Sequence, residues 1–175
     1  MALPPEAHRL QSDHLPTPFS AAQIREGCPV GRTIRVREDA AGEPPAFRRI
    51  VFVEADADGA VTEVQATDAD GRPHGEPSRG QSTWLDLQRH ASQPADATRV
   101  DEVEISLSFG DFPCWHYVVQ RPDAELRFWF AKDLPGMPVL VEEWTDGALV
   151  GSSEMVGNEW GIAVEKDREG SKTRG

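Results

Sequence analysis

Several residue types that mark specialised protein classes are scarce in this chain. It has only 2 cysteines among 175 residues, too few for a small domain held together by disulfides. No stretch reaches the roughly 18 apolar residues that a membrane-spanning helix needs. The first residues, MALPPEAHRL, place prolines and charges where a secretory signal has its apolar segment, so we expect a cytoplasmic protein. Cys28 and Cys114 are then expected to be free thiols, an inference that removal of an export signal would reverse.

Basic residues are also scarce. Lysine and arginine number 18 against 30 acids, which gives a formal net charge of −12. Proteins bind nucleic acid largely through basic side chains that displace counterions from phosphates, so a nucleic-acid partner is disfavoured. Arginines are nevertheless frequent between residues 19 and 53. They indicate either charge pairing across a sheet or a small anion site near Arg35, Arg37 or Arg48.

Catalytic and cofactor-binding motifs are missing. The chain has no Gly-x-Ser-x-Gly, no phosphate-binding glycine loop, no Cys-x-x-Cys and no His-Glu-x-x-His. The stretch EADADGAVTEVQ approaches the spacing of a calcium loop, but Gln65 stands where a bidentate Glu is needed. A hairpin turn with solvated acids explains the same residues. We therefore predict no cofactor and no metal, and we lean towards a protein that is not an enzyme.

The length of the chain and the distribution of apolar residues favour one domain. Residues 1–18 contain four prolines and no apolar period, which predicts a disordered arm. Residues 165–175 predict a disordered tail for the same reason. A single β-rich domain is expected between them, over residues 19–164.

Two short helices are predicted within the domain. Ser20 can cap the first, AAQIREG, which a Gly and a Pro end. Thr83 can cap the second, because Asp86 follows three positions later as in a capping box. Pro94 limits this helix to about ten residues.

The remaining sequence alternates as strands do. The pairs Asp58-Gly59 and Asp146-Gly147 predict two-residue type I′ hairpins, since both residue types tolerate positive φ. Pro135-Gly136 suits a type II turn. Seven or eight strands joined by short turns predict an antiparallel meander, because parallel strands need connections of about a dozen residues or more.

Some of these strands are apolar on both faces. In ELRFWFAK, Phe128 and Phe130 lie opposite Trp129. Such a sheet must be covered on both faces or curl around a cavity. We therefore predict a mainly β fold of the α+β class, with a single curved antiparallel meander sheet, open or half-barrel, covered by one or two short helices. Coverage by a helix on one face and by a fold-back of the sheet on the other is the alternative.

The stretch FWFAKDLPGMPVLVEEWTDGALVGSSEMV resembles the closing hairpins of the LolA/LppX-like bacterial half-barrel proteins. Those hairpins also run from an aromatic strand through a Leu-Pro turn into a Val-rich strand and an Asp-Gly turn. The resemblance covers about thirty residues of the chain. It implies a curved antiparallel sheet with helices on its concave side, and an apolar cavity that carries lipid or lipoprotein acyl chains.

These observations predict a soluble domain that binds a small apolar or amphipathic ligand in a half-barrel cavity without catalysing a reaction. The predicted ligand-binding residues are Trp84, Cys114, Trp115, His116, Phe128, Phe130 and Trp144. One alternative is a protein-interaction or structural domain with a fully packed core. Another is a small enzyme that uses Cys114 and His116. Protein partners cannot be identified from the sequence.

Cys114 and His116 stand two residues apart in CWHY, so their side chains share one face of a strand with Cα atoms about 6.7 Å apart. That distance is too long for a dependable thiol–imidazole hydrogen bond. Both side chains could still contact one zinc ion if Cys28, His74 or His90 supplied further ligands. Packing at the rim of the sheet, a role in a ligand pocket, and metal or thiol chemistry therefore stay open.

Overall fold

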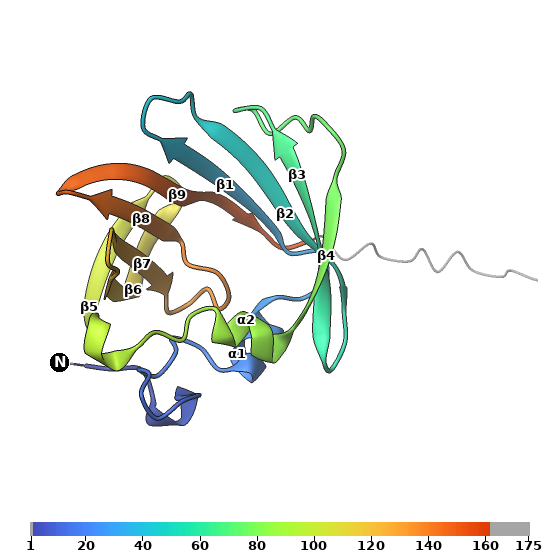
Figure 1. Cartoon of the computed structure of the whole chain (residues 1–175). Helices are drawn as coiled ribbons and strands as arrows, with labels where there is room; N and C mark the ends of the chain where they lie inside the picture. Colours follow the sequence, from blue (N-terminus) through green and yellow to red (C-terminus); the bar gives the residue numbers. More distant parts are fainter. Residues whose placement is uncertain (1, 162–175) are drawn as a thin grey trace, which may run out of the picture.

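A nine-stranded antiparallel sheet forms most of the molecule in the computed structural model, which describes residues 2–161 (Figure 1). The predicted tail, 165–175, lies outside the described residues. The strands are β1 Thr33–Ala40, β2 Ala46–Ala55, β3 Gly59–Thr67, β4 Ser78–Thr83, β5 Thr98–Leu107, β6 Gly110–Gln120, β7 Glu125–Ala131, β8 Leu140–Thr145 and β9 Ala148–Glu159. The sheet is open and curved, which confirms the predicted fold class.

The order of the strands is β4-β3-β2-β1-β9-β8-β7-β6-β5. The expectation of seven or eight strands in one meander was therefore wrong in detail. Two meanders, β1–β4 and β5–β9, are joined where β1 pairs with β9. The segment between β4 and β5 runs from one edge of the sheet to the other, and it carries a helix across the concave side (Figure 1).

Two α-helices lie side by side on the concave side of the sheet (Figure 1). Helix α1 spans Ala21–Gly27, and Ser20 caps it in a capping box with Gln23. Helix α2 spans Trp84–Arg89, and the Thr83 hydroxyl accepts a hydrogen bond from the backbone N–H of Asp86. Single 3₁₀ turns occupy Glu6–His8 (η1) and Ala95–Ala97 (η2).

Helix α2 is shorter than the predicted ten residues. After Arg89 the hydrogen bonds of the backbone change to the tighter i→i+3 type, from Ala91 to Gln88 and from Ser92 to Arg89. This tightening ends the helix before Pro94 can do so.

The two Asp-Gly hairpins differ. Asp146 and Gly147 have φ values of 50° and 75°, which confirms the type I′ turn between β8 and β9. The type I′ prediction at Asp58-Gly59 was wrong, because neither residue has a positive φ. Instead Asp56 Oδ1 accepts hydrogen bonds from the N–H groups of Asp58 and Gly59, at 2.8 and 3.0 Å. These bonds lower the pKa of the Asp56 carboxyl and make a longer turn.

The N-terminal segment is packed against the domain, so the prediction of a disordered arm is corrected for residues 2–18. Pro16 and Thr17 are fully buried. The buried hydroxyl of Tyr117 donates to the Pro16 carbonyl at 2.6 Å, and Gln88 Nε2 donates to Thr17 Oγ1 at 3.0 Å. Hydrogen bonds of the backbone and of side chains, not a periodic apolar face, fix this segment against the domain. The hydrophobic pattern of the sequence therefore did not reveal that it is ordered.

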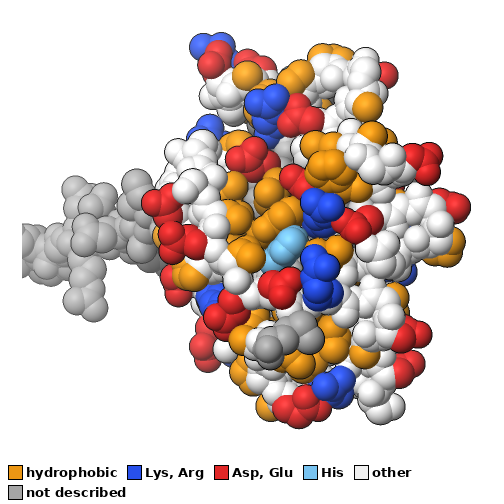
Figure 2. Space-filling view, turned by 90° about the vertical axis from the view of Figure 1, so that its left-hand side faces the viewer, with side chains coloured by type: hydrophobic (Ala, Val, Ile, Leu, Met, Phe, Trp, Pro, Cys, Tyr) orange, Lys and Arg blue, Asp and Glu red, His pale blue; other side chains and the backbone are white. Residues whose placement is uncertain are grey.

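Charges of both signs are interspersed on the surface. In the view of Figure 2, acidic and basic side chains alternate around patches of hydrophobic side chains, so neither sign forms a continuous area on that face. No helix within residues 2–161 is long and apolar enough to cross a membrane.

Candidate functional site

An apolar cavity of about 370 Å³ lies between the two helices and the sheet. Helices α1 and α2, strands β1, β2, β3 and β7, and the loop between β7 and β8 surround it. The lining residues are Ile24, Cys28, Ile34, Ile50, Phe52, Thr62, Val64, Leu87, His90, Ala91, Phe128, Phe130, Gly136, Met137 and Pro138. Only a few of these side chains carry a polar group.

Strand register sets one wall of the cavity. Ile34, Ile50 and Val64 are direct partners across β1, β2 and β3, and strand alternation turns all three towards the concave side. Phe128 and Phe130 stand on β7, three strands from β1 in the order of the sheet. Curvature of the sheet brings them into the same cavity.

The fully buried side chain of Arg32 links helix α1 and the β7–β8 loop to the sheet at one end of the cavity. Its Nη1 donates to the carbonyl oxygens of Gly27, at the end of α1, and of Pro135, in the β7–β8 loop, at 3.0 and 2.6 Å. Its Nε donates to Asn158 Oδ1 on β9 at 2.8 Å. Charge-assisted bonds of this kind are strong, so Arg32 ties two covering elements to the sheet. No motif in the sequence marked this residue.

Gly136 allows the close packing around Arg32. It has a φ of 128°, and a Cβ at this position would lie 3.1 Å from Cys28 Sγ and 3.2 Å from Arg32 Nη1. A larger residue would therefore meet both side chains. Burial raises the pKa of the Cys28 thiol, and the adjacent guanidinium opposes this rise.

Only two of the seven predicted ligand-binding residues, Phe128 and Phe130, line the cavity. Their contact with a ligand stays a prediction. The expectation that Trp84, Trp115 and Trp144 line it was wrong. Trp84 is buried at the start of α2, where its indole N–H donates to the carbonyl of Asp56 at 2.9 Å.

The other two tryptophans are covered by cations. Lys132 Nζ lies 4.0 Å from the ring centroid of Trp115, and the guanidinium carbon of Arg127 lies 4.5 Å from that of Trp144. Both are cation–π contacts. Sequence reasoning missed the aliphatic residues of β1–β3 that line the cavity, because alternation alone does not reveal which apolar faces come together.

Cys114 and His116 lie outside the cavity lining. The His116 ring stacks on Trp129 with centroids 4.3 Å apart, and its Nε2 is buried without a partner among the described residues. Burial is the main cause of a lowered His116 pKa. Burial also raises the pKa of the Cys114 thiol to about 11, so the thiol is protonated at neutral pH. Within residues 2–161, no three His, Cys, Asp or Glu side chains come together as a metal site, so the zinc hypothesis gains no support.

The raised thiol pKa predicts a loss of stability at alkaline pH. The unfolded thiol ionises near pH 8.5 to 9, whereas the folded thiol keeps its proton to about pH 11. Ionisation therefore favours the unfolded chain as pH rises through this window. Urea denaturation between pH 8 and 11 should show a steeper fall in unfolding free energy for the wild type than for Cys114→Ala. An equal dependence of the unfolding free energy on pH in the two proteins would contradict a buried, neutral Cys114 thiol.

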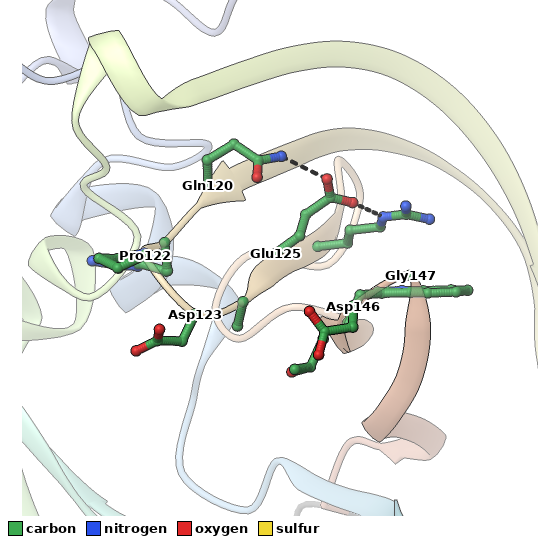
Figure 3. A pocket seen from close by; sticks show the side chains of 11 residues that line it. Gln120, Pro122, Asp123, Glu125, Asp146 and Gly147 are labelled. Carbon is green, nitrogen blue, oxygen red and sulfur yellow. Dashed lines mark hydrogen bonds and ion pairs between the residues drawn. The ribbon is translucent and has the colours of Figure 1, made fainter.

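A second hollow, of about 570 Å³, is open and polar (Figure 3). It lies between the β6–β7 and β8–β9 turns. Along one wall, Glu125 accepts hydrogen bonds from Gln120 Nε2 at 2.5 Å and from Arg127 Nε at 2.6 Å. These polar groups satisfy one another, so they do not need a ligand. The smaller apolar cavity is therefore the better candidate site.

Comparison with known proteins agrees with the fold. No protein-family profile and no curated protein sequence matches this chain. The crystal structure of MucB is similar, with a TM-score of 0.53 and 11% identity over 83% of this chain. The match covers 59% of the MucB chain. The likeness to MucB shows a shared fold, and the half-barrel that the sequence resemblance led us to expect is confirmed.

Two further matches score lower. One is a domain from Vibrio parahaemolyticus assigned to outer-membrane lipoprotein sorting, with a TM-score of 0.30 and 13% identity over 83% of this chain and 93% of that one. The other is a LolA superfamily protein from Nitrosomonas europaea, with a TM-score of 0.27 and 9% identity over 82% of this chain and 94% of that one. Neither score is high enough to carry an argument about this chain.

Proposed function

We propose that this protein binds one small apolar or amphipathic molecule in the cavity between its helices and its sheet. The observation that carries the proposal is the cavity of about 370 Å³ with its mainly apolar lining. Ligand sites are concave, mostly apolar and measure about 300 to 1,000 Å³. A partly open space of this size and lining between the helices and the sheet therefore points to an occupant.

The lining favours a ligand with a long apolar part and a small polar part. Aliphatic and aromatic side chains predominate, and Thr62 and His90 are among the few polar ones. His90 is exposed at the end of α2, so a polar group of the ligand can lie there in contact with water. The volume is near the lower limit for ligand sites and suits a single chain. The resemblance to LolA/LppX-like half-barrels favours an acyl chain.

The proposal predicts saturable binding of a fluorescent apolar probe, 1-N-phenylnaphthylamine, and its displacement by lauric or palmitic acid. An added probe is required because no tryptophan lines the cavity. Ala91→Trp places a large side chain in the cavity and should reduce probe affinity at least about tenfold, while filling of the void keeps the fold stable. Ala22→Trp is the matched control, since Ala22 is exposed on α1.

Equal probe binding by both variants would contradict the cavity as the binding site. Absence of probe and fatty-acid binding by the wild type, and of any small molecule in native mass spectra of the freshly purified protein, would favour the alternative of a structural or protein-interaction domain. Thermal unfolding of each variant, measured in parallel, separates loss of binding from loss of folding.

A further inference from the structure

Strand β5 forms one of the two edges of the open sheet (Figure 1). It spans Thr98–Leu107 and pairs with β6 in a register without a bulge. An edge strand carries a row of backbone N–H and C=O groups with which a strand from another chain can pair. Proteins often protect such an edge with a short strand, a proline, a bulge or charged side chains. Strand β5 has ten residues and no proline, so its protection is limited to charge.

Pro113 of β6 shows which backbone groups of β5 point away from the sheet. Its register partner on β5 is Glu104. The Pro113 carbonyl accepts a hydrogen bond from the backbone N–H of Lys132, on the β7 side, at 2.9 Å. A proline also has no N–H of its own, so Glu104 and Pro113 form a non-hydrogen-bonded pair. The N–H and C=O of Glu104 therefore point to the free edge, and alternation along the strand gives those of Glu102 and Ser106 the same direction.

The free edge of β5 is open to solvent. Within residues 2–161, no backbone hydrogen bond outside the strand ladder reaches β5. Glu102, Glu104 and Ser106, whose backbone groups point outwards, are all exposed. Strand β4, at the opposite edge, offers a partner less, because it has six residues and none of them is hydrophobic. Strand β5 is therefore the edge at which an added strand gains both backbone and side-chain contacts.

The side chains of β5 define the chemistry of such a strand. Val103 and Ile105 are half-buried on one face of β5, and Glu102 and Glu104 are exposed on the other. Opposite charges on directly opposed strand residues stabilise a sheet, as do pairs of apolar residues. A strand in which basic and apolar residues alternate therefore fits both faces of this edge.

A second copy of the chain does not fit the same edge. Antiparallel pairing of β5 with another β5, centred on Glu102, Val103 or Glu104, places a glutamate directly opposite a glutamate. Like charges in such positions destabilise a sheet. The net charge of −12 adds repulsion between two copies. Charge complementarity therefore favours a basic partner over self-association.

We propose that β5 binds an extended basic segment of another protein, which adds one strand antiparallel to β5. Hydrogen bonds to the outward-pointing backbone groups of Glu102 and Glu104 supply affinity, and the alternation of basic and apolar side chains supplies specificity. Strand β5 contributes no residue to the lining of the apolar cavity. This site therefore does not depend on the function proposed for the cavity.

Fluorescence anisotropy with a labelled synthetic peptide in which lysine and valine alternate tests the proposal. The wild type should bind the peptide saturably, and Glu104→Lys should weaken binding by about tenfold or more, because it sets like charges opposite each other. Glu43→Lys is the charge-matched control, since Glu43 is exposed in the turn between β1 and β2. It should retain affinity within about twofold. Thermal unfolding of both variants, measured in parallel, shows that each is folded.

N-methylated peptides separate strand addition from charge attraction, and they need only the wild-type protein. In an antiparallel partner whose lysines lie opposite Glu102 and Glu104, the lysine N–H groups point to β5 and the valine N–H groups point away. N-methylation of the lysines should therefore abolish binding, whereas N-methylation of the valines should preserve it within about threefold.

Four outcomes overturn the proposal. Three of them are absence of peptide binding by the wild type, equal binding of the two methylated peptides, and equal loss of affinity in Glu104→Lys and Glu43→Lys. The fourth is a wild-type dimer in sedimentation analysis that Glu104→Pro dissociates, which would assign the edge to a second copy. A proline is tolerated at this position because the N–H of Glu104 points away from the sheet.

Discussion

Deletion of residues 1–18 should lower the melting temperature by more than about 10 °C, because several buried groups then lose their partners at about 1 to 3 kcal/mol each. The Tyr117 hydroxyl loses the Pro16 carbonyl, and the Gln88 amide loses Thr17. The backbone bond from Leu15 to Gln93 disappears as well. Differential scanning calorimetry of the two proteins measures the effect.

A shorter deletion and one substitution serve as controls. Removal of residues 1–3 should change the melting temperature little, since Ala2 and Leu3 are exposed. Tyr117→Phe removes one buried donor and should cost about 1 to 2 kcal/mol. If proteolysis trims the first 18 residues and the melting temperature stays the same, the segment is not part of the folded domain.

The second large effect is expected from Phe130→Ala, which should cost about 3 to 5 kcal/mol of unfolding free energy. Phe130 is 4% exposed and makes edge-to-face contacts with Phe19 and Tyr117, with ring centroids 6.4 and 5.5 Å apart. It also lines the cavity. Truncation therefore removes core contacts and enlarges the cavity at the same time. Urea denaturation measures the cost.

Trp144→Ala is the comparison for this substitution. Trp144 is a larger aromatic residue, but it is half-buried at the open polar hollow, where its ring contacts the Arg127 guanidinium and its indole N–H donates to Glu142 Oε2 at 2.8 Å. Contacts of these kinds near the surface contribute about 0.5 to 1.5 kcal/mol each, so the loss should be smaller than that of Phe130→Ala. Equal losses for the two variants would contradict the assignment of Phe130 to the core.

The sequence by itself determined the local structure wherever short-range rules apply. The helix caps at Ser20 and Thr83 form as predicted, because an N-cap depends on residues within one turn. The type I′ turn at Asp146-Gly147 forms because only its two central residues need positive φ. Alternation over short segments was also sufficient to predict antiparallel strands and, with the resemblance of residues 128–156, a curved open sheet.

Tertiary structure alone decided which of these elements meet. The pairing of β1 with β9 joins the two ends of the domain, and the curvature of the sheet then brings β7 to the same cavity as β1–β3. The hydrophobic pattern shows that a face of a strand must be buried, but it does not show which other element covers that face. The aliphatic lining of the cavity was therefore not recognised, and three tryptophans were wrongly assigned to that lining. Arg32 and residues 2–18 were missed because hydrogen bonds to distant carbonyls and side chains, which leave no period in the sequence, hold them in the fold.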